Sequence, residues 1–164
     1  MIEKSNSRKI IVMAVLFWCT FLAAGNVMGG ERPLIFPIPQ EVQVNGDFFK
    51  LDETVSIILP PGAGEKDRSL AQLLVKELSD KYGIALKIEN RTNIPAGKKV
   101  ILMGMIQKKK KKKYFSDNHI KITKSNPGPE GYVLQVNSNF IIIGGYDDAG
   151  AFFGLQSLRQ LIQD

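Results

Sequence analysis

The chain has 164 residues, of which 44% are hydrophobic and 23% are charged, so it can bury a core and is not a disordered polymer. Its 22 basic and 16 acidic residues give a net charge of +6, but six of the lysines stand in one run, Lys108–Lys113. Beyond residue 29, the chain without that run would be slightly negative, which excludes a broadly basic nucleic-acid-binding surface. One histidine and one cysteine also exclude a disulfide framework and a transition-metal site built from these ligands.

The first 29 residues have the pattern of a secretory signal peptide. Basic residues precede an uninterrupted apolar run, Ile10–Ala24, and small residues and glycine follow it. The run is shorter than a membrane-spanning helix, and no basic stop-transfer segment comes after it. We therefore expect cleavage after Ala24 or Gly29, export to the periplasm or the cell exterior, and no stable membrane span afterwards. Because Cys19 lies within the apolar run, the exported chain would contain no cysteine.

Extended segments are predicted after this leader. Three prolines in Glu31–Pro39 fix their own φ angles and restrain their neighbours, so this segment is expected to form a stiff extended arm. Asn45-Gly46-Asp47 lies between short extended runs, 41–44 and 48–51, and predicts a hairpin turn. Thr54–Leu59 is β-branched and apolar and predicts a strand, which the prolines and glycine after it end.

Residues 69–82 change to a helical period. The leucines at i, i+3, i+4 and i+8 predict one apolar helix face, formed by Leu70, Leu73, Leu74 and Leu78. Asp67 or Ser69 is expected to cap the start of this helix, and Gly83 suits the left-handed residue at its end.

The segments from 84 to 129 are expected to alternate between strand and loop. In chain order they are a strand at Ile84–Glu89, a polar loop at Asn90–Lys99, a strand at Val100–Met103, an unstructured basic insertion at Lys108–Asn118, a strand at His119–Thr123 and a turn at Asn126–Pro129.

The end of the chain has the clearest periodicity. Gly131–Val136 alternates, with Tyr132, Leu134 and Val136 on one face. Phe140–Ile143 is apolar at every position, which is typical of an interior strand, and Gly144-Gly145 is expected to end it.

A final helix is predicted from Asp147 or Asp148 to about Gln163. Its apolar stripe is Ala151, Leu155, Leu158 and Ile162, and Phe153 projects from the opposite side, which predicts a second partner for this helix. The order of all these elements predicts an α+β fold: a single mixed or antiparallel β-sheet with two main helices packed on it.

Several of these segments resemble one known domain. Glu130–Leu134, Ile141–Gly145 and Asp147–Leu161 are similar to the closing strands and helix of the N-terminal non-catalytic domain of glycoside hydrolase family 20 β-N-acetylhexosaminidases. Residues 37–42 and Gly46-Asp47-Phe48 resemble its opening motif. The resemblance covers about 34–164 and implies the zincin-like α+β fold of that domain. Family 84 enzymes and α-glucuronidases carry a related domain.

The resemblance implies a partner. In such enzymes the domain packs against a (β/α)₈ barrel, which removes terminal N-acetylhexosamine from glycans by a substrate-assisted mechanism with an adjacent Asp–Glu pair. In that barrel the Asp–Glu pair stands in an H-x-G-G-D-E segment. This sequence has no H-x-G-G-D-E segment and is too short to hold a barrel as well. We therefore expect an exported domain, 30–164, without a catalytic residue, cofactor or metal. Its last helix would dock a barrel through Phe152, Phe153 and Gln156.

Three other features imitate chemical sites. Asp147-Asp148 resembles a catalytic acidic pair, but a helix N-cap and a first-turn charge explain it better. The glycines at 144, 145, 150 and 154 suggest a phosphate loop, but the required Gly-Lys-Ser/Thr is absent, and close packing of helix on sheet is the better interpretation of Gly150 and Gly154. His119 is expected to be a surface residue.

Two further segments leave alternatives open. Lys108–Lys113 is either a solvated loop or a site for an acidic polymer, and Asn90-Arg91-Thr92 is a glycosylation sequon that matters in a eukaryotic secretory host. The rival functions are therefore a freestanding carbohydrate-binding or surface-interaction module that uses the lysines, and a small hydrolase that uses Asp147 or Asp148.

Overall fold

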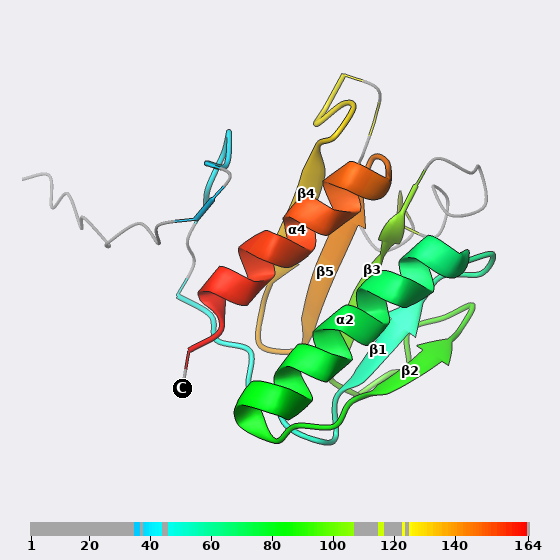
Figure 1. Ribbon diagram of the computed structural model, residues 1–164, viewed down its shortest axis with the longest axis vertical. Coiled ribbons are helices and arrows are strands. Elements are labelled where there is room, and N and C mark those ends of the chain that lie inside the picture. Colours follow the sequence, from blue (N-terminus) through cyan, green and yellow to red (C-terminus); the bar gives the residue numbers. More distant parts are fainter. Residues whose placement is uncertain are drawn as a thin grey trace, which may run out of the picture. The chain divides into compact units, whose positions relative to one another are not determined.

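The computed structural model describes residues 35–36, 38–43, 46–106, 115–116, 123 and 125–163. The described elements form one five-stranded sheet and two long helices. In chain order they are β1 Ser56–Leu59, α2 Glu65–Tyr82, β2 Lys87–Asn90, β3 Val100–Met105, β4 Tyr132–Val136, β5 Phe140–Gly145 and α4 Asp148–Leu161 (Figure 1).

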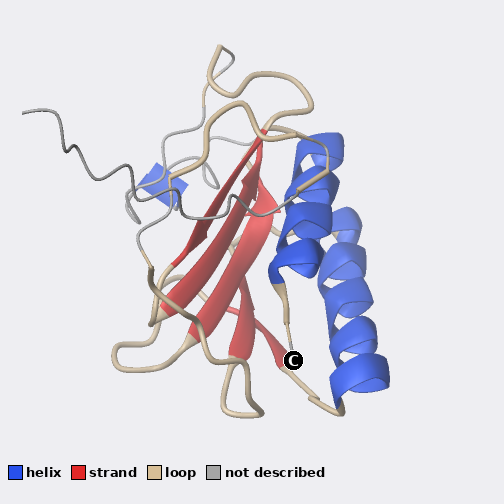
Figure 2. Ribbon diagram, turned by 90° about the vertical axis from the view of Figure 1, so that its left-hand side faces the viewer, coloured by secondary structure: helices blue, strands red, loops and turns tan. Residues whose placement is uncertain are grey.

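The sheet is mixed, with strand order β2-β1-β3-β5-β4. The first four strands of this order run parallel to their neighbours, and β4 runs antiparallel to β5. A parallel pair needs a crossover, and α2 supplies it between β1 and β2. Figure 2 shows both helices on the same face of the sheet. The predicted α+β fold, with two helices on a mixed sheet, is therefore confirmed.

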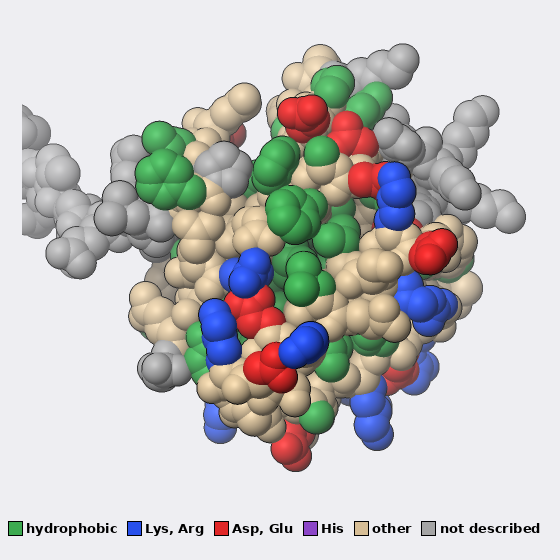
Figure 3. All heavy atoms as spheres, in the orientation of Figure 1, with side chains coloured by type: hydrophobic (Ala, Val, Ile, Leu, Met, Phe, Trp, Pro, Cys, Tyr) green, Lys and Arg blue, Asp and Glu red, His purple; other side chains and the backbone are tan. Residues whose placement is uncertain are grey.

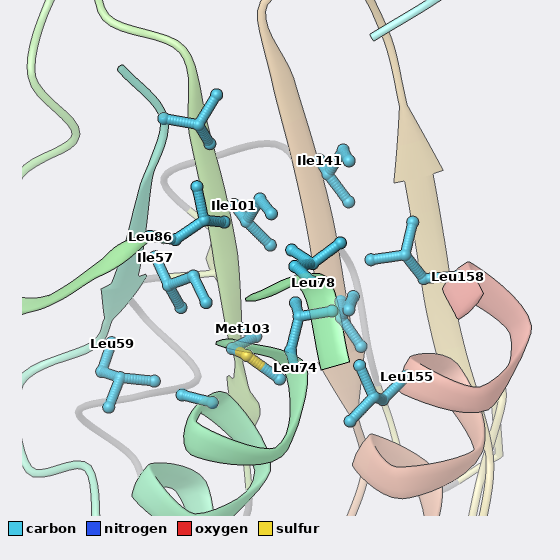
Figure 4. Close-up of a cluster of buried hydrophobic side chains, with 13 residues drawn as sticks. Ile57, Leu59, Leu74, Leu78, Leu86, Ile101, Met103, Ile141, Leu155 and Leu158 are labelled. Atoms are coloured by element: carbon cyan, nitrogen blue, oxygen red, sulfur yellow. The ribbon is translucent and has the colours of Figure 1, made fainter. Parts of the chain in front are cut away.

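The main core lies between the sheet and the two helices. Figure 4 shows leucines of α2 and α4 pointing toward aliphatic side chains of β1, β3 and β5. Because alternate residues of a strand point to the same face, this layer takes every second residue of each strand. Its buried members include Ile57, Leu59, Leu74, Leu78, Ile101, Met103, Ile141, Ile143, Leu155 and Leu158.

A second, smaller cluster covers the other face of the sheet. It consists of Ile58, Val100, Leu102, Ile106, Phe115 and Ile142. Phe115 is fully buried there and lies in a helical turn with Ser116, so the expectation of a wholly unstructured insertion at 108–118 is wrong at these two residues. Packing an aromatic side chain on an apolar sheet face stabilises the fold even when the side chain follows a lysine run.

The strand β5 extends further than predicted. Gly144 and Gly145 do not end it but pair with Gly104 and Met105 of β3. A Cβ at Gly145 would overlap the backbone of Ala151 in α4, so this glycine allows the helix to cross the end of the strand closely.

The helix α2 starts earlier than predicted, and its buried stripe matches the predicted one only in part: Leu74 and Leu78 are buried, and Leu70 packs at the edge of the core. Gly64, which follows the strand-ending loop at Pro60-Pro61-Gly62, is its N-cap, and Asp67 lies in its first turn. The buried positions are 67, 71, 74 and 78, with the i, i+4, i+7, i+11 spacing of a single helix face. Leu73 lies off this line and is 39% exposed, so its assignment to the buried stripe is wrong.

Asp67 joins α2 to the sheet. Its carboxylate accepts hydrogen bonds from the N–H of Gly64 at 2.8 Å and from the N–H of Met105 at 3.0 Å. Asp67 is fully buried and does cap the helix, but from its third residue, where its side chain reaches back to the N-cap backbone. Ser69 takes no part in this cap.

The hairpin predicted around residues 45–47 is also wrong. The described residues of 38–43 and 46–53 contain no strand, and Phe48 is 87% exposed. Asn-Gly favours a tight turn locally, but flanking strands also need hydrogen-bonded neighbours, and the described part of 41–51 pairs with no strand. The predicted leader (1–29), the lysine run (108–113) and His119 lie outside the described residues.

Candidate interdomain docking surface

The start of α4 is fixed by Asp147. Its Oδ1 accepts the N–H of Gly150 at 2.9 Å, and its Oδ2 accepts the N–H of Glu130 at 3.0 Å. The hydrogen bonds from Glu130 and Gly150 stabilise the charged form and lower the pKa of Asp147. The predicted N-cap is therefore confirmed, and this carboxylate also ties the helix to the turn before β4.

Small residues bring α4 close to the sheet. A Cβ at Gly150 would overlap the carbonyl oxygen of Gly131, and one at Gly154 would lie 2.7 Å from Cγ2 of Ile143. The close-packing interpretation of both glycines is confirmed. The hydroxyl groups of Tyr132 and Ser157 also lie 2.6 Å apart, which links β4 to the inner face of α4. The sequence thus fixes which side of α4 faces outward.

The outward side of α4 carries the residues predicted for docking. Phe152 is 41% exposed, Phe153 and Gln156 are half-buried, and the two phenyl rings meet edge to face with centroids 6.0 Å apart. The inner stripe predicted for the helix is buried at Ala151, Leu155 and Leu158. The helix ends at Leu161, and Ile162 is already extended.

Two ion pairs join α2 and α4, which lie side by side. Lys66 pairs with Asp148 near the start of both helices, and Glu77 pairs with Arg159 further along. Each pair joins residues 82 positions apart, so the helices run parallel and in register. Eleven residues separate the two pairs on each helix, about 16 Å of helix length.

Apolar side chains lie between these two ion pairs. Leu73 of α2 and Phe152 of α4 are exposed at this level, and Phe153 continues the surface across α4. Figure 3 shows hydrophobic side chains gathered over the helices, with charged groups beyond them in both directions. We call Leu73, Phe152, Phe153 and Gln156 the docking surface. Sequence reasoning placed Leu73 in the buried stripe of α2 and therefore did not assign it to this surface. In the structure Ala71, not Leu73, belongs to the buried stripe.

Gln156 is held by a polar chain that crosses to α2. Its Oε1 accepts a hydrogen bond from Nη1 of Arg159 at 2.6 Å, and Arg159 and Lys81 both pair with Glu77. Burial acts to raise the pKa of Glu77, but the hydrogen bonds from Lys81 and Arg159 outweigh it and leave the pKa below its ordinary value. The polar member of the docking surface is therefore oriented rather than loose.

The other candidate sites do not form chemical centres in the described part of the chain. Lys66 donates a hydrogen bond to the carboxylate of Asp148, and this bond raises the pKa of Lys66. The two adjacent carboxylates therefore serve the helix start and an ion pair. A shallow hollow is lined by Asn90 to Asn93, and Asn90 is exposed at the end of β2. The described residues contain no cluster of three metal-ligating side chains.

Neither of the described helices is long and apolar enough to cross a membrane. This observation concerns α2 and α4 and does not extend to the predicted leader.

Comparisons with known proteins agree with this architecture. The chain is 27% identical over 128 residues to the β-hexosaminidase of Porphyromonas gingivalis (strain ATCC BAA-308 / W83), covering 78% of this chain and 14% of that protein. Its fold is similar to the structure of CpGH84D, with a TM-score of 0.61 and 25% identity over 80% of this chain and 21% of the other. CpGH84B gives 0.52 and 26%, over 81% and 20%.

The chain therefore spans about one seventh of the curated relative and one fifth of each similar structure. The family described as glycosyl hydrolase family 20, domain 2, matches residues 32–164. The chain belongs to this family, as its domain 2, a non-catalytic accessory domain.

Proposed function

We propose that this chain supports the catalytic barrel of an exported β-N-acetylhexosaminidase, and that the docking surface on α2 and α4 is where the barrel packs. The barrel would remove terminal N-acetylhexosamine from glycans. The observation that carries the proposal is the exposed apolar surface of Leu73, Phe152 and Phe153, framed by two ion pairs on the outer side of a well-packed helix layer.

Physical chemistry supports this role for the surface. The inner faces of both helices are already used by the sheet, so the exposed apolar groups contribute nothing further to the chain's own core. Burying a fully exposed phenylalanine yields about 1.5–3 kcal/mol, and the exposed 41% of Phe152 corresponds to a fraction of that free energy. Anchors of this kind, surrounded by oriented polar groups such as Gln156, are typical of interaction surfaces.

The similarity to the β-hexosaminidase of P. gingivalis supports the proposed substrate class. Asp147 and Asp148 are engaged as helix cap and ion pair, so the proposal gives this chain no chemistry of its own. The predicted leader supports export, which cell fractionation tests: the chain should leave the cytoplasm and lose its first 24 or 29 residues.

A direct experiment tests the division of labour. A family 20 barrel is fused after Asp164 and assayed with a chromogenic N-acetylglucosaminide, beside the unfused chain. We expect turnover from the fusion and none from the chain. Turnover by the chain that disappears in an Asp147→Asn, Asp148→Asn double variant would contradict the proposal and favour a small hydrolase.

A further inference from the structure

Gln160 of α4 binds the backbone of the arm at the start of the described chain. The Nε2 group of Gln160 donates to the carbonyl oxygen of Phe36 at 2.6 Å, and its Oε1 accepts the N–H of Phe36 at 2.8 Å. The same Nε2 donates to the carbonyl oxygen of Gln156 at 3.0 Å. A primary amide that bonds both backbone groups of one residue acts like a strand neighbour, and we call this contact the Gln160 clamp.

The clamp fixes a backbone whose large side chains remain in water. Ile35 is buried, but Phe36 is 66% exposed and Ile38 is 77% exposed. Two exposed apolar side chains on a backbone tied down by a specific side chain differ from scattered surface residues, which need no explanation. A partner that covers these side chains would lose little conformational entropy from the arm, because the backbone at Phe36 is already ordered.

The clamp also places the arm next to the docking surface. Phe152, Gln156 and Gln160 follow an i, i+4, i+8 spacing, so they form one row along the outer side of α4. Hydrogen bonds connect the row from Gln156 through Gln160 to Phe36. The row therefore has an exposed apolar side chain at each end, Phe152 on the helix itself and Phe36 on the arm bound to Gln160.

We propose that Phe36 and Ile38 extend the docking surface, and that the same family 20 catalytic barrel covers them. This inference rests on the proposed function and adds a second anchor to it, at the opposite end of α4 from Phe152. Continuity along one helix row favours a single occupant for both anchors. The matched relative also has most of its length outside this domain, which leaves ample chain to supply that occupant.

The clamp is tested first, on the chain without a partner. The amide hydrogen of Phe36 is followed by hydrogen exchange in the wild type, in Gln160→Met and in Gln156→Met. We expect exchange about tenfold faster in Gln160→Met, which lacks both hydrogen bonds, and little change in Gln156→Met, because the side chain of Gln156 bonds to Arg159 and not to Phe36. Equal exchange rates in all three proteins would overturn the clamp and, with it, the inference.

The partner is tested by titrating a separately expressed family 20 barrel into the chain. Phe36→Ser should raise the dissociation constant by about tenfold or more. Phe48→Ser removes an exposed phenylalanine outside the row and should leave the dissociation constant unchanged. Weakening by Phe152→Ser but not by Phe36→Ser overturns this inference and keeps the proposed function. No binding by the wild-type chain overturns both.

Sedimentation of the chain alone distinguishes another occupant. A wild-type dimer that Phe36→Ser converts to a monomer would show that a second copy covers the arm, and would overturn the inference. A monomer in both cases agrees with it.

Discussion

The two sides of α4 differ in burial and in what they contact. On the inner side, Ala151, Leu155 and Leu158 are buried against the sheet, and Gly150 and Gly154 have no room for a Cβ. On the outer side, Phe152 is exposed and Phe153 and Gln156 are half-buried. The inner side is explained by this chain alone, whereas the proposed function assigns the outer side to a partner. Substitutions on the two sides should therefore affect different measurements.

The largest contrast is between Leu155 and Phe152. In the isolated chain, Leu155→Ala should lower the free energy of unfolding by about 2–5 kcal/mol, because it leaves a cavity in the main core. Phe152→Ala should lower it by less than about 1 kcal/mol, because its ring is already in contact with water. Urea denaturation of both variants measures the difference, and equal losses would erase the distinction between the two sides.

Gly150→Ala tests how closely α4 approaches the sheet. An added Cβ would overlap the carbonyl oxygen of Gly131, so backbone must move, and we expect a loss of about 1–3 kcal/mol in the free energy of unfolding. Alanine favours a helix interior over glycine by up to about 1 kcal/mol, so a stabilised variant would show that the helix can shift outward at no cost.

Asp147 adds a pH dependence to the inner side. Asp147→Ala should cost about 0.5–2 kcal/mol at neutral pH, because the cap and the bond to Glu130 are both lost. The pKa of Asp147 is lowered in the folded chain, so its contribution is present above its unfolded pKa of roughly 3.9 and is lost as the pH falls through the lower folded value. Urea unfolding at pH 7 and pH 3 should show that the difference in the free energy of unfolding between the wild type and Asp147→Ala is smaller at pH 3. A deficit that grows on acidification would contradict this assignment.

The smallest effect is expected for the ion pair that frames the docking surface. Lys66 is exposed, so Asp148→Asn should change the free energy of unfolding less than any variant above, and 1 M salt should remove most of that change. Thermal unfolding with and without salt measures it. A loss as large as that of Asp147→Ala would mean that the pair holds the two helices together.

Local pattern predicted the helices and central strands well and tertiary contacts poorly. The spacing of apolar residues placed the stripe of α4, and the acidic residue before it placed the cap, because both signals depend on neighbours within one or two turns. The strand order and the parallel pairing follow from contacts between distant segments, which no local period contains. The hairpin predicted at 41–51 failed for the same reason.

The candidate site was predictable in part. Phe153 projected away from the apolar stripe, which was enough to indicate an outward-facing surface on α4. Leu73 and the Gln160 clamp were missed, because the first depends on which leucines of α2 reach the sheet and the second joins residues 124 positions apart. The burial of Phe115 in the second core was not predicted, because this residue follows the lysine run closely in the sequence.

The measurement that tests the central claim most directly is calorimetry of the fusion between this chain and a family 20 barrel. We predict that the wild-type chain raises the unfolding temperature of the barrel relative to the barrel alone, and that a Phe152→Ser, Phe153→Ser double variant abolishes this increase and leaves the chain folded. An unfolding temperature of the barrel that is the same with the wild-type chain, with the double variant and without either would contradict the claim that this surface supports a catalytic domain.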